Sequence, residues 1–283
     1  MPEPQRPSTE SSTDANAVYA LGSSEIETER LRRQADELAG DSAVLLDRAE
    51  LAQGERALDL GCGPRGVLDL MAARVGPRGA VVGIDADPKH VAAARQFVAE
   101  QQLAGVEVIE ADARATGLPT GSFDVVHGRT LLVTIPKPAD VVAEMVRLAR
   151  PGGWVVSLEP DVEYSMCYPP NQAFTRINEL FAVAFSRNGA DPALGRKATE
   201  LLRDNGLHDV GVDVRTQMFP LGHTRRTARL DLVRAMRSQI IQMGLADGAE
   251  LDELDRQARR HLDNPATIAI LGFLFLAWGR KPA

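Results

Sequence analysis

A glycine-rich turn with a carboxylate on either side is the first group of residues that could do chemistry. Gly61, Gly63 and Gly66 follow a short apolar stretch and precede a helical pattern, in the spacing GxGxxG. Asp59 stands two residues before the turn, and Asp85 ends the next apolar stretch, 19 residues after Gly66. Such a turn lets the backbone approach a nucleotide-like ligand, and a carboxylate at the position of Asp85 can accept both hydroxyls of a ribose.

The charge of Asp59 distinguishes two classes of ligand. A carboxylate beside the turn repels a pyrophosphate but attracts the amino group and the sulfonium of a cationic ligand. We therefore expect a sulfonium donor rather than NAD or FAD. A nicotinamide-dependent oxidoreductase and a non-enzymatic binding module would share the turn, and both stay open as alternatives.

The turn belongs to a repeated alternation of strand and helix patterns. Asp87, followed by Pro88, is typical of a helix start. We expect helices at 67–75, 88–103, 138–148 and 192–205, and strands at 57–60, 80–84, 106–109, 123–126, 154–158, 209–214 and 268–278. Strands that alternate with helices pair in parallel through right-handed crossovers. The predicted fold is therefore α/β, with a doubly wound, seven-stranded, mostly parallel sheet.

Two helical segments interrupt this alternation and suggest how the chain is organised. The proline- and serine-rich beginning lacks the apolar stretch of a signal peptide. The expected parts are a disordered tail (1–17), an N-terminal helical lid (18–50), a ligand-binding α/β core (51–160), a helical insertion (161–191), a core helix and strand (192–223), a second helical insertion (224–264) and a final core strand (265–283).

Five features in register make a family resemblance specific. Residues 58–63 (LDLGCG) resemble the first motif of the class I S-adenosylmethionine-dependent methyltransferases; Asp85 and residues 110–113, 123–129 and 150–153 follow in that family's order. The resemblance covers about residues 47–159. It implies a Rossmann-like methyltransferase fold, S-adenosyl-L-methionine as cofactor and S-adenosyl-L-homocysteine as product, with the helical insertions forming a lid.

The resemblance also assigns cofactor roles to individual residues. In the family, the first loop holds the methionine part, an acid ending the second strand binds the ribose, and an Asp after the third strand meets the adenine. The corresponding cofactor-binding residues are Asp59, Gly61, Cys62, Gly63, Asp85, Ala86, Asp112, Ala113, Gly128 and Arg129, with Gln34 from the N-terminal helix. Asp59 acts near the methionine amine either directly or by fixing the loop, and Arg129 holds a carboxylate or forms an ion pair.

Three residues are candidates for catalysis. His127 is expected just after the fourth strand and Glu159 just after the fifth, where polar groups often face a substrate, and Tyr19 lies on the expected lid. Each could equally be an ordinary structural residue. Orientation of the reactants alone can supply roughly 7–11 kcal/mol, so methyl transfer requires neither a general base nor a metal.

Aromatic residues in the first insertion are expected to line a substrate pocket. They are Tyr164, Tyr168, Phe174, Phe181 and Phe185. We expect an apolar small molecule, a secondary metabolite, as the methyl acceptor. A resemblance to the teleocidin-type C-methyltransferases of prenylated indole alkaloids suggests C-methylation of a prenyl group; O- or N-methylation of an aromatic or polyketide metabolite is the alternative.

Composition and charge exclude other classes of protein. With 32 basic and 39 acidic residues the net charge is −7, which disfavours nucleic acid as a partner. Six arginines are expected on a solvated face of mixed charge: Arg225, Arg226, Arg229, Arg256, Arg259 and Arg260. The apolar stretch 268–278 is too short for a membrane helix. Two cysteines outside any metal-binding spacing favour the cytoplasm, and the subunit count stays open between a monomer and a homo-oligomer.

Overall fold

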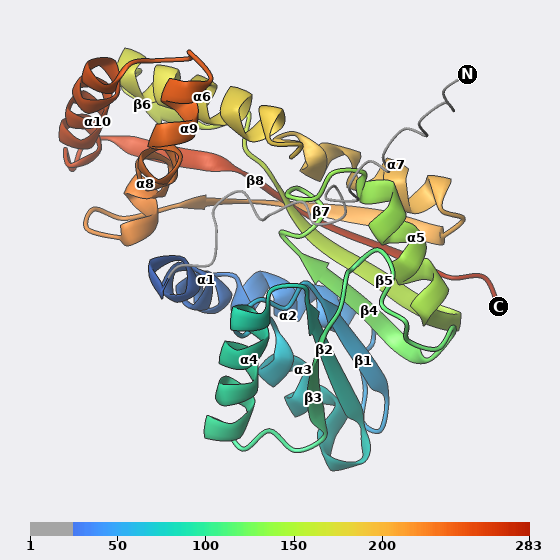
Figure 1. The fold of residues 1–283 in the computed structure, drawn as a ribbon. Helices are drawn as coiled ribbons and strands as arrows, with labels where there is room; N and C mark the ends of the chain where they lie inside the picture. Colours follow the sequence, from blue (N-terminus) through green and yellow to red (C-terminus); the bar gives the residue numbers. More distant parts are fainter. Residues whose placement is uncertain (1–24) are drawn as a thin grey trace, which may run out of the picture.

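A computed structural model of the protein describes residues 25–283. Over that range the chain forms an α/β fold in which helices cover both faces of one sheet (Figure 1). The predicted fold class is therefore confirmed. The expected tail over residues 1–17 and the candidate Tyr19 lie outside the described residues.

The sheet contains eight strands, one more than the sequence predicted. Their order is β3-β2-β1-β4-β5-β8-β6, and β7 pairs with the opposite edge of β8. The strands are β1 (Arg56–Leu60), β2 (Ala80–Asp85), β3 (Val106–Glu110), β4 (Phe123–Arg129), β5 (Ala149–Asp161), β6 (Met166–Tyr168), β7 (His208–Met218) and β8 (Ile268–Arg280). The five strands β1 to β5 are parallel, whereas β8 runs antiparallel to β5, β6 and β7. The additional strand is β6, whose three residues are too few to show a strand pattern.

Successive residues of the strands point to opposite faces of the sheet, and each face has its own helices. Val81 packs in a buried cluster with residues of α2, α3 and α4, whereas its neighbour Val82 packs in a second cluster with residues of α5 and α7. The helices are α1 (Glu25–Glu37), α2 (Ala39–Arg48), α3 (Leu68–Val75), α4 (Pro88–Glu100), α5 (Pro138–Leu148), α6 (Gln172–Arg187), α7 (Leu194–Asp204), α8 (Ala228–Ala235), α9 (Arg237–Gln242) and α10 (Gly248–Leu262), with short 3₁₀ helices η1 (Gly76–Arg78) and η2 (Thr224–Thr227). The predicted cap is present: the Asp87 side chain accepts a hydrogen bond from the Lys89 N–H at the start of α4.

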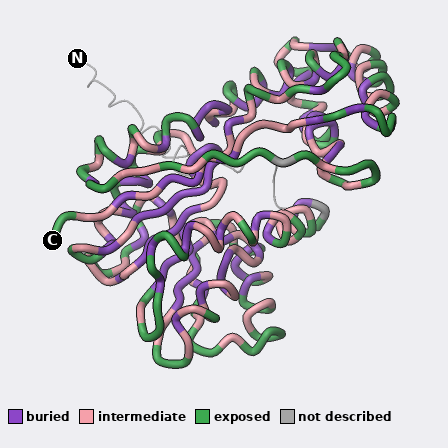
Figure 2. The backbone as a smooth tube through the Cα atoms, turned by 180° about the vertical axis from the view of Figure 1, so that it is seen from behind, coloured by how far each residue is buried: buried purple, intermediate pink, exposed green. Residues whose placement is uncertain are grey.

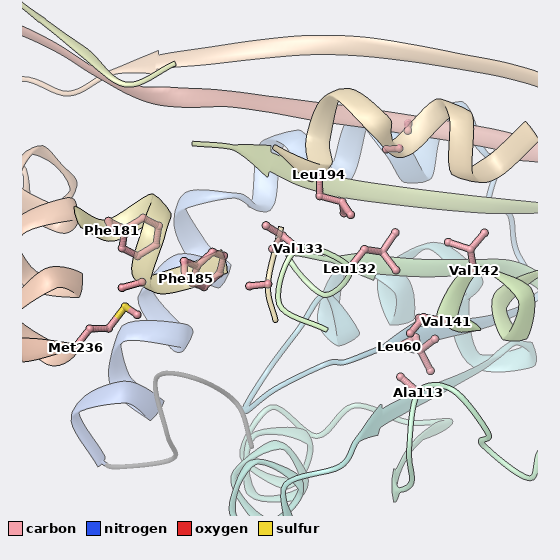
Figure 3. Packing of buried hydrophobic residues seen from close by; sticks show 14 of the residues in the cluster. Leu60, Ala113, Leu132, Val133, Val141, Val142, Phe181, Phe185, Leu194 and Met236 are labelled. Carbon is pink, nitrogen blue, oxygen red and sulfur yellow. The ribbon is translucent and has the colours of Figure 1, made fainter. Parts of the chain in front are cut away.

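The two helical insertions pack against each other. Helix α6 contacts α8, α9 and α10, and together they surround the end of β8 that extends beyond the parallel strands (Figure 1). A continuous buried cluster runs from Met236 and Phe181 in this helical part, through Phe185 and Val133, to Leu60 in the sheet (Figure 3). Four of the parallel strands, β1, β2, β4 and β5, are buried along most of their length, whereas β3 at the edge is partly exposed (Figure 2).

Two parallel strands are longer than the sequence predicted. Strand β4 continues to Arg129 and β5 to Asp161, so His127 and Glu159 lie inside the sheet and not after it. Both side chains are 0% exposed. The prediction ended the first strand before His127 and the second before Glu159, but these polar groups have buried hydrogen-bond partners, which allows them to stay in the sheet.

Candidate active site

The glycine-rich turn joins β1 to α3 and is fixed by backbone conformations that favour glycine. Gly61, Gly63 and Gly66 have φ angles of +71°, +57° and +58°. The Cys62 N–H donates to the Ile84 carbonyl over 2.8 Å, which ties the turn to β2. A Cβ added at Gly66 would lie 2.0 Å from Asp59 Oδ2, so this position has no room for a side chain.

Asp59 holds the turn from beneath. It is 1% exposed, and its Oδ2 accepts a hydrogen bond of 2.8 Å from the Val67 N–H at the start of the following helix. Its Oδ1 lies 2.8 Å from His127 Nδ1 on the neighbouring strand β4, at the matching register position. Asp59 therefore places a negative charge beneath the turn through contacts within the protein.

Asp85 ends β2 with its side chain turned toward the glycine turn. Its Oδ2 accepts from the Gly63 N–H over 2.8 Å, and its Oδ1 accepts from the Asp87 N–H over 2.9 Å, closing a turn around the exposed Ala86. Its Oδ1 also lies 3.5 Å from His90 Nδ1. A carboxylate offers about four acceptor positions, so about one remains after these contacts. Asp85 can thus accept a further hydroxyl group.

Asp112 and Ala113 follow β3. Asp112 forms an ion pair with Arg114, whose Nη2 lies 2.7 Å from Oδ2, and this hydrogen bonding lowers the pKa of the Asp112 carboxyl below its usual value. Ala113 is 7% exposed and packs in the cluster beneath α5. The Ala111 N–H donates to the Asp85 carbonyl, which sets the two loops side by side.

Arg129 and Gly128 close the other side of the turn. Gly128 is buried in β4 opposite Leu60, and the next residue, Arg129, donates to the Gly66 carbonyl over 3.1 Å and to Ser42 Oγ over 3.2 Å. Burial lowers the pKa of the Arg129 guanidinium. Both contacts are hydrogen bonds to uncharged groups and not an ion pair.

Two cavities meet above the turn. The smaller, about 40 Å³, is lined by Asp59, Gly61, Cys62, Gly63 and Arg129, among others, with Gln34 and Thr130 on its edge. The larger has a volume of about 710 Å³ and also includes Gln34 and Thr130. Its wall comes from α1, the loop after β4, the end of β5, α6, η2 with α8, and β8. The site therefore combines a confined pocket at the turn with a roomy chamber beside it.

Comparisons with known proteins agree with this geometry. A family model described as a methyltransferase domain matches residues 58–157. A demethylmenaquinone methyltransferase of Geobacillus sp. (strain WCH70) is 36% identical over 197 residues, which are 64% of this chain and 83% of that protein. The chain belongs to the class I S-adenosylmethionine-dependent methyltransferases.

Two further similarities place this methyltransferase among its relatives. An aklanonic acid methyltransferase of Streptomyces sp. (strain C5) is 34% identical over 116 residues, which are 41% of this chain and 53% of that protein. The chain spans about half the length of two Streptomyces relatives that it matches. The solved structure of a Haemonchus contortus phosphoethanolamine N-methyltransferase 2 with S-adenosylhomocysteine has the same fold, with a TM-score of 0.55 at 19% identity, covering 86% of this chain and 53% of that one.

The residues at the turn of the methyltransferase fit S-adenosylmethionine. A Cβ added at Gly63 would meet only Leu31 Cδ1, at 4.0 Å, so the backbone there faces open space in which a ligand can lie against it. Asp85 retains an acceptor position for a ribose hydroxyl, and Asp59 supplies negative charge near a sulfonium. Burial raises the pKa of the Cys62 thiol, so this residue is a packing group and not a nucleophile.

His127 and Glu159 do not line either cavity of the methyltransferase. His127 is enclosed beside Asp59, and its Nε2 has no hydrogen-bond partner among the described residues. The Glu159 carboxylate accepts hydrogen bonds of 3.1–3.2 Å from the N–H groups of Leu131, Leu132 and Val133. Burial raises the pKa of Glu159 to about 7. Because both side chains are enclosed by protein, neither can reach an acceptor in the cavity.

The aromatic residues expected around the substrate divide into three groups. Phe181 and Phe185 line the large cavity, whereas Phe174 is 1% exposed in the core behind them. Tyr164 and Tyr168 are 55% and 63% exposed and lie outside the cavity wall. Tyr164 precedes β6 and Tyr168 is its last residue, and both are largely exposed to solvent.

The cavity wall contains residues that the sequence did not single out. Phe219 and Phe273 add two aromatic side chains to it. The expectation that Arg225, Arg226 and Arg229 belong to a solvated face is wrong. Arg226 and Arg229 are 5% and 4% exposed, and Arg225 is partly buried. Arg229 is buried where α8 packs against α6. Arg226, in η2, is buried where its guanidinium donates to the carbonyls of Leu262 and Phe219. The local charge pattern reveals neither arrangement.

Neither a metal cluster nor a membrane helix occurs between residues 25 and 283. No three His, Cys, Asp or Glu side chains of this part of the chain are grouped so that they could hold a metal ion. None of its helices combines the length and the apolar character needed to cross a bilayer.

Proposed function

We propose that this methyltransferase methylates a small metabolite with a large apolar body, bound in the 710 Å³ cavity. The observation that carries the proposal is the boundary between the two cavities. Gln34 and Thr130 line both, so a molecule in the large cavity meets a donor held at the turn at that boundary. Four phenylalanines in the wall favour an apolar or aromatic body: Phe181, Phe185, Phe219 and Phe273.

The cofactor would be held by the residues around the turn. In this proposal Gly61 and Gly63 contact the methionine part, Asp85 accepts the ribose hydroxyls, and Asp112 with the Ala113 backbone contacts the adenine. Cys62, Ala86, Gly128, Arg129 and Gln34 complete the surroundings. S-adenosylmethionine supplies an electrophilic methyl group on a sulfonium when it is bound.

We further propose an oxygen atom as the methyl acceptor. Five arginines and three acidic residues line the large cavity, so its wall carries more positive than negative side chains. Positive charge stabilises an oxygen anion, which is a nucleophile without help from a general base. The same charge opposes the tertiary carbocation that C-methylation of a prenyl group would create, so the structure offers that chemistry no support. The protein's part is then to orient the acceptor and exclude water.

A labelling experiment tests the reaction. The protein is incubated with methyl-labelled S-adenosylmethionine and a fractionated metabolite extract, and labelled products are identified by mass spectrometry. We expect a labelled apolar molecule with its new methyl group on oxygen. A product methylated on carbon would contradict the choice of acceptor, and transfer to none of the fractions would contradict the proposed function.

The site is tested by binding of S-adenosylhomocysteine to Asp85→Ala. Loss of an acceptor to the ribose hydroxyls should cost about 1.5–3 kcal/mol, a decrease in affinity of about 10-fold or more in calorimetry. Asp85→Asn should lose less because one acceptor oxygen remains. NAD should not bind to the wild-type protein.

Glu107→Ala on the exposed side of β3 is the control for Asp85→Ala, and its affinity should match that of the wild type. Urea unfolding of each variant shows whether it is folded, since Asp85 also accepts two backbone hydrogen bonds. Wild-type affinity in a folded Asp85→Ala would refute the assignment.

A further inference from the structure

A buried arginine in the wall of the large cavity has no carboxylate partner among residues 25–283. Arg229 on α8 is 4% exposed, and its Nε and Nη1 have no hydrogen-bond partner among the described residues. Burial, and then the charge of Arg225, lower the pKa of Arg229 from its ordinary value to about 9. The guanidinium is therefore still positively charged at neutral pH.

Other arginines of the same wall have carboxylate partners. Arg30 pairs with Glu27 at 2.7 Å. Arg225 pairs with Glu37 at 3.3 Å, and Arg234 pairs with Asp255 at 3.1 Å. Arg229 differs from these three in having its charge enclosed and two of its nitrogens without an acceptor.

Packing alone does not account for a charge in this place. The Arg229 guanidinium lies over the Phe181 ring, 4.0 Å from its centroid, and such a cation–π contact is attractive. A ring face, however, offers no acceptor to the five N–H groups of a guanidinium, and a buried ion without its partner is costly. An apolar side chain of similar size would fill the same space without that cost.

We propose that Arg229 binds a carboxylate of the substrate, so that the methyl acceptor is an organic acid with an apolar body. The inference rests on the proposed function, because it takes the large cavity as the substrate site. The planar guanidinium matches the two oxygens of a carboxylate, and the Phe181 and Phe185 rings beside it suit the apolar part of the same molecule. The arginine thereby selects acidic over neutral metabolites.

Binding of a matched pair of probes tests this role without knowledge of the natural substrate. The probes are 2-naphthoate and the neutral 2-naphthamide, titrated into the full chain in the presence of S-adenosylhomocysteine. We expect the wild-type protein to bind naphthoate at least 10-fold more tightly than naphthamide. Arg229→Met should abolish this preference, and Arg229→Lys, which keeps the charge but not the planar fork, should keep part of it.

Arg256→Met is the matched control for Arg229→Met. Arg256 lies on α10 outside the cavity wall, its side chain is 63% exposed, and it pairs with Glu253 on its own helix. Its preference for naphthoate should equal that of the wild type. Thermal unfolding provides a second readout: Arg229→Met should be at least as stable as the wild type, because it removes a buried charge and not a structural partner.

The outcomes separate this proposal from the proposed function. Equal affinities for the two probes, no binding of naphthoate, or a preference that survives Arg229→Met would each overturn the role of Arg229. In the labelling experiment, the substrate should come from the acidic fraction of the extract. Labelled product from neutral fractions alone would contradict a carboxylate on the substrate but would leave methyl transfer intact. If no fraction gives a labelled product although the protein still prefers naphthoate, the result would count against the proposed function alone.

Discussion

Glu159 fixes the loop that forms the boundary between the two cavities. Its carboxylate accepts hydrogen bonds from three successive backbone N–H groups of that loop and from Ser157 Oγ, with no exposure to solvent. Burial disfavours the charged carboxylate, while the four donors favour it. The balance raises the pKa of Glu159 from 4.5 to about 7. This buried acid thus contributes to stability in a way that depends on pH.

Glu159→Gln should destabilise the protein and remove part of its pH dependence. The amide has one acceptor oxygen where the carboxylate has two, so the Val133 N–H loses its acceptor, at a cost of about 1–3 kcal/mol. In the wild type, the pKa is higher in the folded than in the unfolded state, so the stabilising proton is lost as pH rises through about 7. The free energy of unfolding should fall by about 3 kcal/mol between pH 5 and pH 8 from this group.

Urea unfolding at several pH values measures both effects. The other titrating groups contribute equally in the two proteins. The difference in free energy of unfolding between the wild type and Glu159→Gln therefore reports on this residue alone, and this difference should become smaller as pH rises. Glu107→Gln, at an exposed position of β3, should follow the wild type throughout. A difference that is constant from pH 5 to pH 8 would mean that Glu159 is ionised over the whole range.

Residues whose role lies in a local motif could be predicted, and residues whose role depends on a distant partner could not. Asp85 and Gly63 were predicted to lie together because their spacing along the chain is the signal, and they are hydrogen-bonded to each other. Arg229 was missed because the charges of α8 look mixed in sequence. One signal was present: Arg229 and Val233 are four residues apart, so they share the face of the helix that also buries Leu230.

At the scale of elements, the turn between β1 and α3 has both a particular backbone conformation and an open side, and a substitution can change one without the other. Its glycines adopt positive φ angles, and the space above Gly63 is open, as the proposed cofactor site requires. Strand β2 fixes the turn, because the Asp85 carboxylate at its end accepts a hydrogen bond from the Gly63 N–H. The turn is thus held in one conformation by protein contacts while one side of it remains open.

Gly63→Ala should lose cofactor binding with only a modest loss of stability. Its φ angle of +57° should cost an alanine about 1–2 kcal/mol, but the added Cβ meets no protein atom closer than 4.0 Å. Gly206→Ala is the matched control, with φ +81° and nothing within 4 Å, in the loop before β7. Both should be destabilised similarly in urea, but only Gly63→Ala should lose at least 10-fold in affinity for S-adenosylhomocysteine. Equal affinities would mean that the cofactor does not lie against Gly63.

The elements themselves were predicted well where a regular pattern continues and less well where a polar residue interrupts it. The helix at 138–148 was predicted at its observed limits, and the closing antiparallel strands were found. The prediction ended strands β4 and β5 too early, before His127 and before Glu159. Both continue because Asp59 lies beside His127 across the β1–β4 register, and the loop after β4 folds back onto Glu159. Neither partner can be seen before the strand order is known.

At the scale of the whole molecule, the last strand joins the parts that form the site. Strand β8 pairs with β5 on one edge and with β7 on the other, and its first residues pair with β6 beside the helical insertions. It also contributes Leu271, Gly272, Phe273 and Leu274 to the large cavity. The proposed cofactor residues lie at 34–129, but the sheet that supports them is completed only by β8, which ends at Arg280.

Removal of residues 268–283 should therefore abolish folding and binding of S-adenosylhomocysteine, although every proposed cofactor residue is retained. Leu276 and Ala277 are 0% exposed between β5 and β7. Each large apolar side chain lost from such a position removes roughly 1.5–3 kcal/mol, and several are lost, against a total stability of about 5–15 kcal/mol. A chain ending at Lys281 keeps all of β8 and should bind as the wild type does. Soluble expression, circular dichroism and calorimetry compare the two shortened chains. If the chain ending at Thr267 is soluble and binds S-adenosylhomocysteine with wild-type affinity, the parallel strands fold without their antiparallel neighbours and the prediction is wrong.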